Sequence, residues 1–509
     1  MQQNMIIPSF WTGTAIIGLV ACAYVSYQCL LSPLARFPGP FAAKLSKGWR
    51  AYKTANGQWH RKLVDLHRKY GHVVRIAPNE LSVGDPSSFR KIYSPAEAGN
   101  GFNKAACYSV VQGNRPFDLT GERNEKVHSE QRKLVATAYS MSSMVHFESK
   151  VNVVIETVIH KLEARCRKTI DLGHWLQMWA FEPTRPLLNS LKPDVIGSVS
   201  FSQPFGYVES GDDEGVFKRI QNAMGSAAWL MHAGWLFRLH QKLIPICGNW
   251  LAVNDRNGYF FQVACREVSG RINRGGDDKD IIGQLLETQK IKPQLKDLDI
   301  SFMMTSNVFA GSDSTSIAFQ SIFYLLLTHP AAHDRLMREL REREEKGELS
   351  DPVSFQEAES WPYLQAIIYE AMRLYAPAAF VLDRVVPPEG MMIEDKFVPG
   401  NTVVGSSAWV IHRNPEIWGP DVDTFRPERW LDDSTFLIDK KGALQPFSFG
   451  PRNCLGRHLA YQEIKLALAK LVYHFDLELN PKCGDWDEQK NFTFWVKPPL
   501  WVNLHPVKS

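Results

Sequence analysis

The feature that most constrains the fold of this chain is a loop around one cysteine near its carboxyl end. The loop reads Phe447-Ser448-Phe449-Gly450-Pro451-Arg452-Asn453-Cys454-Leu455-Gly456. Gly450 and Gly456 bracket Cys454 and permit tight turns that bring the backbone close to a flat ligand, which residues bearing a Cβ resist. Backbone amides in such a turn can donate to the sulfur and tune a thiolate that ligates iron. The loop therefore predicts that Cys454 ligates an iron porphyrin, the alternative being a buried structural cysteine.

The same loop resembles the haem-binding signature of the cytochrome P450 family, Phe-x-x-Gly-x-Arg-x-Cys-x-Gly, at every specified position. The resemblance implies haem b with the Cys454 thiolate as axial ligand of its iron. Arg452 is then expected to pair with a haem propionate, and Phe447 to shield the sulfur from water. The resemblance runs from about Phe37 to the carboxyl terminus.

A second motif, Ala310-Gly311-Ser312-Asp313-Ser314-Thr315, interrupts a long apolar segment with helical spacing. Glycine, aspartate and serine are poor helix formers, so their presence inside a strong helix indicates function. The alternative is a kinked helix with solvent-facing polar side chains.

This motif resembles the oxygen-activating segment of the family. Ala310 and Gly311 would leave room for dioxygen, Asp313 would relay protons, and a hydroxyl follows. Ser314 stands where threonine is commoner; it keeps the hydroxyl but lacks the methyl group that stiffens χ1. Thr315 offers a second hydroxyl, and the sequence leaves open which of the two serves the oxygen.

A third motif, Glu370-Ala371-Met372-Arg373, places a carboxylate and a guanidinium on one helix face. Taken alone, such a pair is usually a solvated surface contact. In the resembled family, an arginine matching Arg429 of Phe425-Arg426-Pro427-Glu428-Arg429-Trp430 joins the pair behind the haem. The resemblance therefore implies a buried structural cluster of Glu370, Arg373 and Arg429.

Three further basic residues are candidate partners of the haem propionates. His128 and Arg132 lie four residues apart in a segment that resembles the family's propionate-contacting helix. Arg384 follows Pro377 by a spacing that the family uses for another such contact. For each of the three, the alternative is a solvated side chain.

Charge and cysteine content exclude several classes of protein. Lys plus Arg number 58 against 54 Asp plus Glu, for a formal net charge of +4, without the basic tract typical of nucleic-acid binding. The eight cysteines are scattered and form no C-x-x-C pair, which favours a reducing compartment and argues against zinc. Seven of them are expected to be ordinary thiols.

The amino terminus predicts a membrane anchor. No charged side chain occurs from Met1 to Ala35, and apolar residues concentrate between Ser9 and Leu31, about the length that spans a bilayer. Basic residues follow directly, which places the body on the cytoplasmic side of the membrane. The family resemblance implies that this is the membrane of the endoplasmic reticulum. A cleaved signal peptide is the alternative, but the charged amino-terminal region of such peptides is missing.

The chain is expected to divide into an anchor (1–32), a Pro/Gly hinge and lead-in (33–60) and one haem-thiolate monooxygenase domain (61–509). The predicted fold is mainly α-helical with small β-sheets, the cytochrome P450 fold, behind a single transmembrane helix. Residues 73–83 predict a short hairpin, Leu298 to His329 and Phe355 to Tyr375 predict helices, and Ile393 to Ile411 predict strands and turns.

The predicted pocket walls are largely apolar and aromatic: Phe102 to Val111, Phe302 to Phe309, Ala378 to Leu382 and Asn491 to Phe494. Such walls bury hydrophobic ligands. The stretch holding Met224, Trp229, Met231 and Trp235 is either a lid or plain core. Ser314, the hinge and the segment 192–197 resemble fungal microsomal members, especially the pisatin demethylase group.

The resemblance implies a monooxygenase that inserts one oxygen atom into a lipophilic secondary metabolite (terpenoid, polyketide, alkaloid or phenolic). Electrons are expected from NADPH through NADPH-cytochrome P450 reductase, with cytochrome b5 as a further candidate partner, because the chain shows no Gly-rich dinucleotide loop. Two alternatives remain: a haem-thiolate isomerase or dehydratase that needs no reductase, and a non-enzymatic membrane haem or electron-transfer protein.

Overall fold

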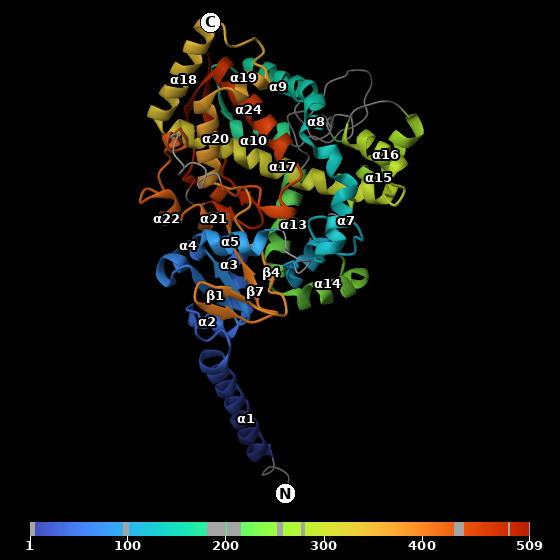
Figure 1. The fold of residues 1–509 in the computed structure, drawn as a ribbon, viewed down its shortest axis with the longest axis vertical. Helices are drawn as coiled ribbons and strands as arrows, with labels where there is room; N and C mark the ends of the chain where they lie inside the picture. Colours follow the sequence, from blue (N-terminus) through green and yellow to red (C-terminus); the bar gives the residue numbers. More distant parts are fainter. Residues whose placement is uncertain are drawn as a thin grey trace.

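The computed structural model describes residues 6–94, 101–180, 200, 215–251, 258–275, 280–431, 442–486 and 489–507. It is mainly helical with small sheets, as predicted, and a single apolar helix projects from one end of the body (Figure 1). That helix, α1 (Ile6–Ser26), continues as one π-helical turn, η1 (Tyr27–Leu31). The span Trp11–Leu31 is long and apolar enough to cross a membrane, and only 6% of its most apolar window is buried in the protein.

The predicted hairpin is confirmed at the end of the body nearest α1. β1 (Val73–Ala77) pairs antiparallel with β2 (Glu80–Val83), and β2 pairs parallel with β7 (Val403–Gly405). β4 (Arg384–Val385) completes a sheet of order β1-β2-β7-β4. The sheet thus brings the chain around residue 384 next to the amino-terminal hairpin.

Three smaller sheets complete the β-structure of the described residues. They are β5 (Met391–Ile393) with β6 (Lys396–Val398), β9 (Lys490–Asn491) with β10 (Trp495–Val496), and β8 (Phe475–Leu479) with β11 (Trp501–Pro506) and β3 (Thr169–Asp171). The turn between β9 and β10 includes Thr493 and Phe494, which reach the central cavity.

The long helix predicted from Leu298 to His329 is confirmed as α17 (Asp297–Thr328), which runs through the middle of the body (Figure 1). Acidic side chains at Asp297 and Asp299 suit the positive end of its dipole. Around it pack α10 (Leu172–Ala180), α15 (Tyr259–Arg274), α20 (Pro362–Leu374) and α24 (Arg457–His474). One large apolar core joins these helices. Within it, the rings of Trp179 and Phe319 meet edge to face, with their centroids 4.4 Å apart.

The remaining α-helices surround this core. They are α2 (Phe41–Leu45), α3 (Lys47–Ala55), α4 (Trp59–Tyr70), α5 (Pro86–Tyr93), α6 (Ser109–Gln112), α7 (Glu125–Val135), α8 (Met141–Met144), α9 (Glu148–Glu163), α13 (Val216–Leu230), α14 (Gly234–Cys247), α16 (Ile281–Ile291), α18 (Pro330–Glu345), α19 (Phe355–Glu359), α21 (Ala408–Ile411) and α22 (Pro415–Trp418).

The single helix predicted from Phe355 to Tyr375 is in fact two, α19 and α20. Ser354 caps α19 in a reciprocal box with Glu357, and α19 ends at Glu359. Pro362 then occupies the first turn of α20, where the missing N–H costs nothing. The sequence signal for the break was this proline. Likewise, Ala408 to Ile411 form the short helix α21 rather than strand, since the Ser407 side chain accepts from Trp409 N and caps it.

Candidate functional site

The central cavity, of about 380 Å³, lies where α17, α24, α7 and the Cys454 loop meet. Most of its wall is apolar, including Val110, Val111, Met224, Met231, Met303, Phe309, Phe380 and Phe494. All four predicted pocket walls contribute residues to it. Met224 and Met231 of the predicted lid or core stretch face it too, whereas Trp235 is 65% exposed.

The Cys454 loop is held in shape by two left-handed residues. Ser448 has φ 62° and Gly450 has φ 69°. A Cβ on Gly450 would lie 1.9 Å from the Tyr93 carbonyl oxygen, so close packing against α5 is what requires glycine there. Cys454 N then donates to Phe447 O at 2.9 Å. The result is a tight loop that exposes the Cys454 sulfur to the cavity.

The surroundings of Cys454 act on its thiol in opposite directions. Enclosure by the protein raises the pKa of Cys454, whereas a hydrogen bond from the Gly456 backbone and the charges of Arg132 and Arg457 lower it. The amide donor near the sulfur matches the sequence expectation. Phe447 also lines the cavity, and its ring packs against the ring of Tyr461 with the two centroids 5.0 Å apart. Enclosure is the larger effect, so the pKa of the Cys454 thiol lies above its usual value, and the Gly456 amide and the two guanidiniums offset this only in part.

Across the cavity, Ala310, Gly311, Ser314 and Thr315 of α17 line the wall. Ser314 Oγ donates to Ala310 O at 2.5 Å, one helical turn back. This bond competes for a backbone acceptor and loosens the helix locally. Two small residues and two hydroxyls thus face the same space as Cys454.

Asp313 points elsewhere. Its Oδ1 accepts from Gln177 Nε2 of α10 at 3.2 Å, and it is not among the described residues that line the cavity. Burial raises the pKa of Asp313 to about 6, which the Gln177 hydrogen bond partly opposes. The structure therefore separates the acid of the motif from its hydroxyls, and any proton transfer between them would have to pass around the helix.

The four predicted basic residues gather at one side of the cavity, and all line it. Arg132 donates to Asn453 O at 2.8 Å and to Asn453 Oδ1 at 2.6 Å, directly beside Cys454. Arg452 Nε donates to Glu125 Oε2 at 2.8 Å. Both guanidiniums have a pKa lowered chiefly by burial. The pairing of Arg132 and Arg452 with haem propionates therefore stays a prediction. Arg452 already has a carboxylate partner, Glu125.

His128 and Arg384 are buried, 2% and 3% exposed. Burial, reinforced by neighbouring cations, lowers the pKa of His128 to about 2, so its ring is neutral. Its Nδ1 has no hydrogen-bond partner among the described residues. Arg384 donates to the Asp383 carbonyl at 3.1 Å and lies 5.1 Å from the Tyr93 ring centroid.

Lys104 is a cavity residue that the sequence analysis missed. It is 6% exposed, donates to Thr120 O at 2.7 Å and pairs across a β-bridge with Arg384. Burial, followed by the charges of Arg384 and Arg452, lowers its pKa well below the usual value. A lone lysine inside the otherwise apolar predicted wall 102–111 was the available signal.

This set of groups fits a haem. Among the described residues, neither Lys104 nor Arg384 has a carboxylate within 4.0 Å, although buried cations are normally paired. His128 Nδ1 is a buried polar atom without a hydrogen-bond partner in the part of the chain that the structure describes. Two propionates would supply the missing anions, and Cys454 would supply the axial sulfur on the same cavity.

Glu463 of α24 is a second missed residue. It lines the cavity although it is 2% exposed, and its Oε1 has no partner among the described residues. Its carboxyl group bonds to the Thr315 side chain, and burial raises its pKa to about 8. The signal was an acid on an apolar helix face, one turn after Leu459 and Ala460.

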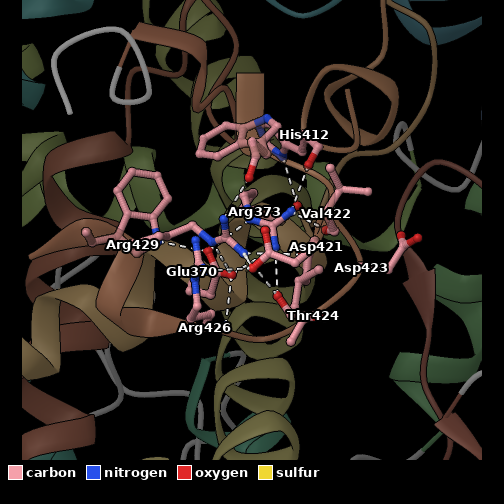
Figure 2. A network of polar contacts seen from close by, with 12 residues as sticks. Glu370, Arg373, His412, Asp421, Val422, Asp423, Thr424, Arg426 and Arg429 are labelled. Atoms are coloured by element: carbon pink, nitrogen blue, oxygen red, sulfur yellow. Dashed lines mark hydrogen bonds and ion pairs between the residues drawn. The ribbon is translucent and has the colours of Figure 1, made fainter. Parts of the chain in front are cut away.

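The predicted cluster of Glu370, Arg373 and Arg429 is assembled behind the Cys454 loop, and Figure 2 shows its contacts. Arg373 Nε donates to Glu370 Oε2 at 2.9 Å and Arg429 Nε to Glu370 Oε1 at 2.8 Å. Trp430 Nε1 and Arg426 N also donate to this carboxylate, at 2.9 Å and 3.0 Å. These bonds and the two charges hold the pKa of Glu370 below its usual value against the effect of burial.

His412, which the sequence analysis did not single out, connects this cluster to the Cys454 loop. Arg373 Nη1 donates to His412 O at 2.8 Å. Gln445 N donates to His412 Nε2 at 2.8 Å, so Nδ1 carries the proton and donates to Arg373 O at 3.0 Å. Burial lowers the pKa of His412 to about 3, which keeps this neutral tautomer. Ser448 N in turn donates to Gln445 O.

Comparison with known proteins identifies the family of this chain. The profile of the family described as Cytochrome P450 matches residues 40–502. The chain is 37% identical over 504 residues to the cytochrome P450 monooxygenase hepD of Aspergillus oryzae, covering 97% of this chain and 95% of the relative. It is 32% identical to a pisatin demethylase of Fusarium vanettenii, over 94% of this chain and 90% of the relative. It is 30% identical to the cytochrome P450 monooxygenase aba2 of Botryotinia fuckeliana, over 97% of this chain and 95% of the relative. The segment 192–197 used for the finer resemblance lies outside the described residues.

We predict that Glu370→Ala abolishes haem incorporation. The change leaves two buried guanidiniums without their shared carboxylate, which costs about 3 to 5 kcal/mol in a buried pair, and it loosens the link through His412 to the Cys454 loop. The haem absorbance per purified polypeptide and the free energy of unfolding should both fall.

Glu428→Ala is the matched control for this prediction. Glu428 lies in η7 (Pro427–Trp430) beside Arg429 but pairs with Arg335 at the surface, where the two side chains are 46% and 40% exposed, and it also accepts from Tyr363 OH at 2.9 Å. The expected loss is up to about 1 kcal/mol for the ion pair and about 1 kcal/mol for the hydrogen bond, without loss of haem. A Glu370→Ala protein with full haem content would contradict the structural role of the cluster.

Proposed function

This chain belongs to the cytochrome P450 family and is a monooxygenase, and on that basis we propose that Cys454 holds haem b and that one atom of dioxygen enters a lipophilic secondary metabolite. The observation that carries the proposal is the shared cavity. Cys454 on one wall faces Ala310, Gly311, Ser314 and Thr315 on the other. Residues from two distant parts of the sequence thus enclose one apolar space.

When bound, the haem supplies dioxygen activation, assisted by electron donation from the thiolate. The protein residues contribute binding, orientation and proton supply. Arg132, Arg384 and Lys104 are placed to hold the propionates, with His128 as a neutral donor or acceptor nearby. Ser314 and Thr315 present hydroxyls to the cavity, and its apolar wall excludes water.

The substrate proposed is an apolar small molecule of the terpenoid, polyketide, alkaloid or phenolic type. The wall offers methionine, phenylalanine and valine side chains with few polar groups, which is how proteins bind lipophilic ligands. Among the relatives, the Fusarium vanettenii protein is named for demethylation of pisatin. Electrons would come from NADPH through the reductase, with cytochrome b5 as a further donor.

Membrane attachment would use α1 as a single-pass anchor in the endoplasmic reticulum, with the body in the cytoplasm. Lys47 and Arg50 both bind Glu80 within the body, which leaves Arg36 and Lys44 as the charges nearest the membrane. Helix α14 lies at the end of the body from which α1 projects (Figure 1), and this region exposes apolar side chains. They include Trp235 (65% exposed) and Ile246 (80%), with Trp250 (54%) just beyond the helix. These side chains would add a second, shallow membrane contact.

We predict that the full chain, reduced with dithionite and treated with carbon monoxide, shows a Soret band strongly shifted to the red, because the Cys454 thiolate would donate electron density to the haem iron that binds carbon monoxide. The absorption spectrum of the purified protein measures this. Cys454→Ser should retain the fold and lose the shifted band. A band at the histidine-ligated position, or none, in the unaltered protein would contradict the role of Cys454.

We predict that Ser314→Ala lowers the product formed per NADPH consumed about tenfold and raises hydrogen peroxide, because proton delivery by a positioned group typically contributes at least ~10²-fold. Product, NADPH and peroxide are measured together once a substrate is found. Ser301→Ala is the control, since Ser301 Oγ makes the same bond to the carbonyl one turn back, at 3.0 Å, without lining the cavity. Unchanged coupling in Ser314→Ala would refute the role of Ser314.

We predict that removal of residues 1–32 weakens binding to phosphatidylcholine vesicles without abolishing it. Adding Ile246→Ser to the truncated protein should reduce the remaining binding about tenfold, because burying such a side chain contributes about 1.5 to 3 kcal/mol. Vesicle flotation measures both steps, and Ile272→Ser on α15, 44% exposed, is the control. Equal binding of the full and truncated chains would contradict the anchor.

A further inference from the structure

A second, much smaller cavity lies beside the central one and is called the small cavity below. Its volume is about 20 Å³, and its wall comes from α3, the first turn of α4, the end of α13 with the turn after it, the segment before β4, and β9 with the turn that follows. Met231, Phe380 and Thr493 line both cavities, so a group that projects past these side chains from a ligand in the central cavity enters the small one. The small cavity has room for one water-sized group but for no ring, because a single water needs roughly 10 to 15 Å³ of such space.

Three residues of the small cavity carry buried N–H donors that have no acceptor among the described residues. The donors are Arg50 Nε, Trp59 Nε1 and Asn491 Nδ2. The three residues are only 2%, 4% and 3% exposed, so bulk water does not serve these donors either. Buried donors are normally paired, and one that stays unpaired is costly. The wall of the small cavity therefore offers more donors than the protein itself satisfies.

The donors are held in place by other contacts of the same residues. Arg50 Nη1 donates to Glu80 Oε2 at 2.7 Å, and Arg50 Nη2 donates to Asp383 Oδ2 at 3.0 Å. Asn491 N donates to Gly57 O at 2.9 Å, and Asn491 pairs with β10 in the β9–β10 sheet. A ligand that accepts from these donors would bind a preorganised site, which lowers the entropic cost of binding.

The charged groups around the small cavity balance one another. Lys47 and Arg50 bind the carboxylates of Glu80 and Asp383. Desolvation, followed by the charge of Arg50, lowers the pKa of His232 well below its usual value, so its ring adds no charge. The wall thus has no surplus positive charge to attract an anion. A carboxylate would also lie beside Asp383, and two carboxylates that share a site repel each other.

We propose that the small cavity is a subsite for a neutral carbonyl oxygen of the substrate, which accepts hydrogen bonds from the donors of Arg50, Trp59 and Asn491. This inference rests on the proposed function and adds a chemical feature to its substrate. The apolar body of the substrate occupies the central cavity, and a ketone, ester or lactone oxygen at one end occupies the small cavity. A carbonyl oxygen has two lone pairs, so it satisfies two of the three donors at once. The substrate then carries oxygen before this enzyme acts on it, and a reaction that forms or retains a carbonyl group must supply it.

The first test compares three probes of equal chain length on the purified full-length holoprotein: 2-dodecanone, dodecane and dodecanoate. Binding is measured by the rise in melting temperature with probe concentration, which does not depend on the haem spectrum, and by the shift of the Soret band. The ketone is expected to bind at least about tenfold more tightly than the alkane, the factor that corresponds to one satisfied buried donor. The carboxylate is expected to bind more weakly than the ketone.

The second test removes one donor. Asn491→Leu should lower the affinity for 2-dodecanone about tenfold and leave that for dodecane nearly unchanged, because leucine keeps apolar volume but cannot donate. Trp59→Phe, which removes the indole N–H, should act in the same direction. Without a probe, Asn491→Leu should melt no lower than the unaltered protein, since the lost donor had no acceptor. Asn152→Leu on α9 is the matched control, because the side-chain oxygen of Asn152 is also buried without a partner among the described residues but Asn152 lines neither cavity.

Three outcomes would overturn the inference. Equal affinities for 2-dodecanone and dodecane, or no affinity for either, would mean that the small cavity holds water only. Tighter binding of dodecanoate than of the ketone would contradict the neutral acceptor. A lower melting temperature of Asn491→Leu, with equal losses for ketone and alkane, would mean that Asn491 is only structural. Absence of the red-shifted carbon monoxide band in the unaltered protein would instead overturn the proposed function, and the melting experiment separates the two failures.

Discussion

The buried carboxylate of Glu370 is the interaction on which the rest of the site depends. It has no access to water, and both of its oxygens are shared between two guanidiniums, an indole N–H and a backbone amide. A buried ion pair rarely adds much net stability, but loss of one partner is severe because the other charges stay buried. The cluster therefore acts as a constraint on geometry. It fixes α20 against the 421–430 segment, and through His412 and Gln445 it fixes the start of the Cys454 loop.

The cavity in front of that loop has two electrostatically different walls. The wall toward α7 and β4 holds more buried basic groups than the described carboxylates nearby neutralise: Lys104, Arg132, Arg384 and Arg452. Burial, followed by the charges of Arg384 and Arg452, lowers the pKa of Lys104. Toward α17 and α24 the wall holds small residues, hydroxyls and one acid without a cation. A flat cofactor with two carboxylates at one edge is complementary to this asymmetry, because its anionic edge would meet the first wall and leave the second for reactants.

Sequence patterns found the parts of this site that are local and missed those that depend on tertiary structure. The Cys454 loop, α17, the β1–β2 hairpin and the Glu370 cluster were predictable from short motifs, the last with help from the family resemblance. Glycine at 450 was expected to admit a cofactor, whereas its Cβ position is taken by the Tyr93 carbonyl of α5, a contact that spacing cannot show. Lys104, His412 and Glu463 were missed for the same reason. Each takes its partners from distant parts of the chain, and only the packed neighbours reveal its role.

The motif in α17 shows how helix geometry divides labour between adjacent residues. Side chains on a helix advance by about 100° per residue, so Ala310, Gly311, Ser314 and Thr315 share the face that lines the cavity, and Asp313 lies outside that face. Asp313 instead meets Gln177 of the neighbouring helix. The acid that does line the cavity is Glu463 of α24, whose carboxyl group bonds to Thr315. Burial keeps both acids protonated at higher pH than in water, at the expense of stability. This loss of stability, and the poor helix formers at 311–314, are typical of residues that serve chemistry rather than folding.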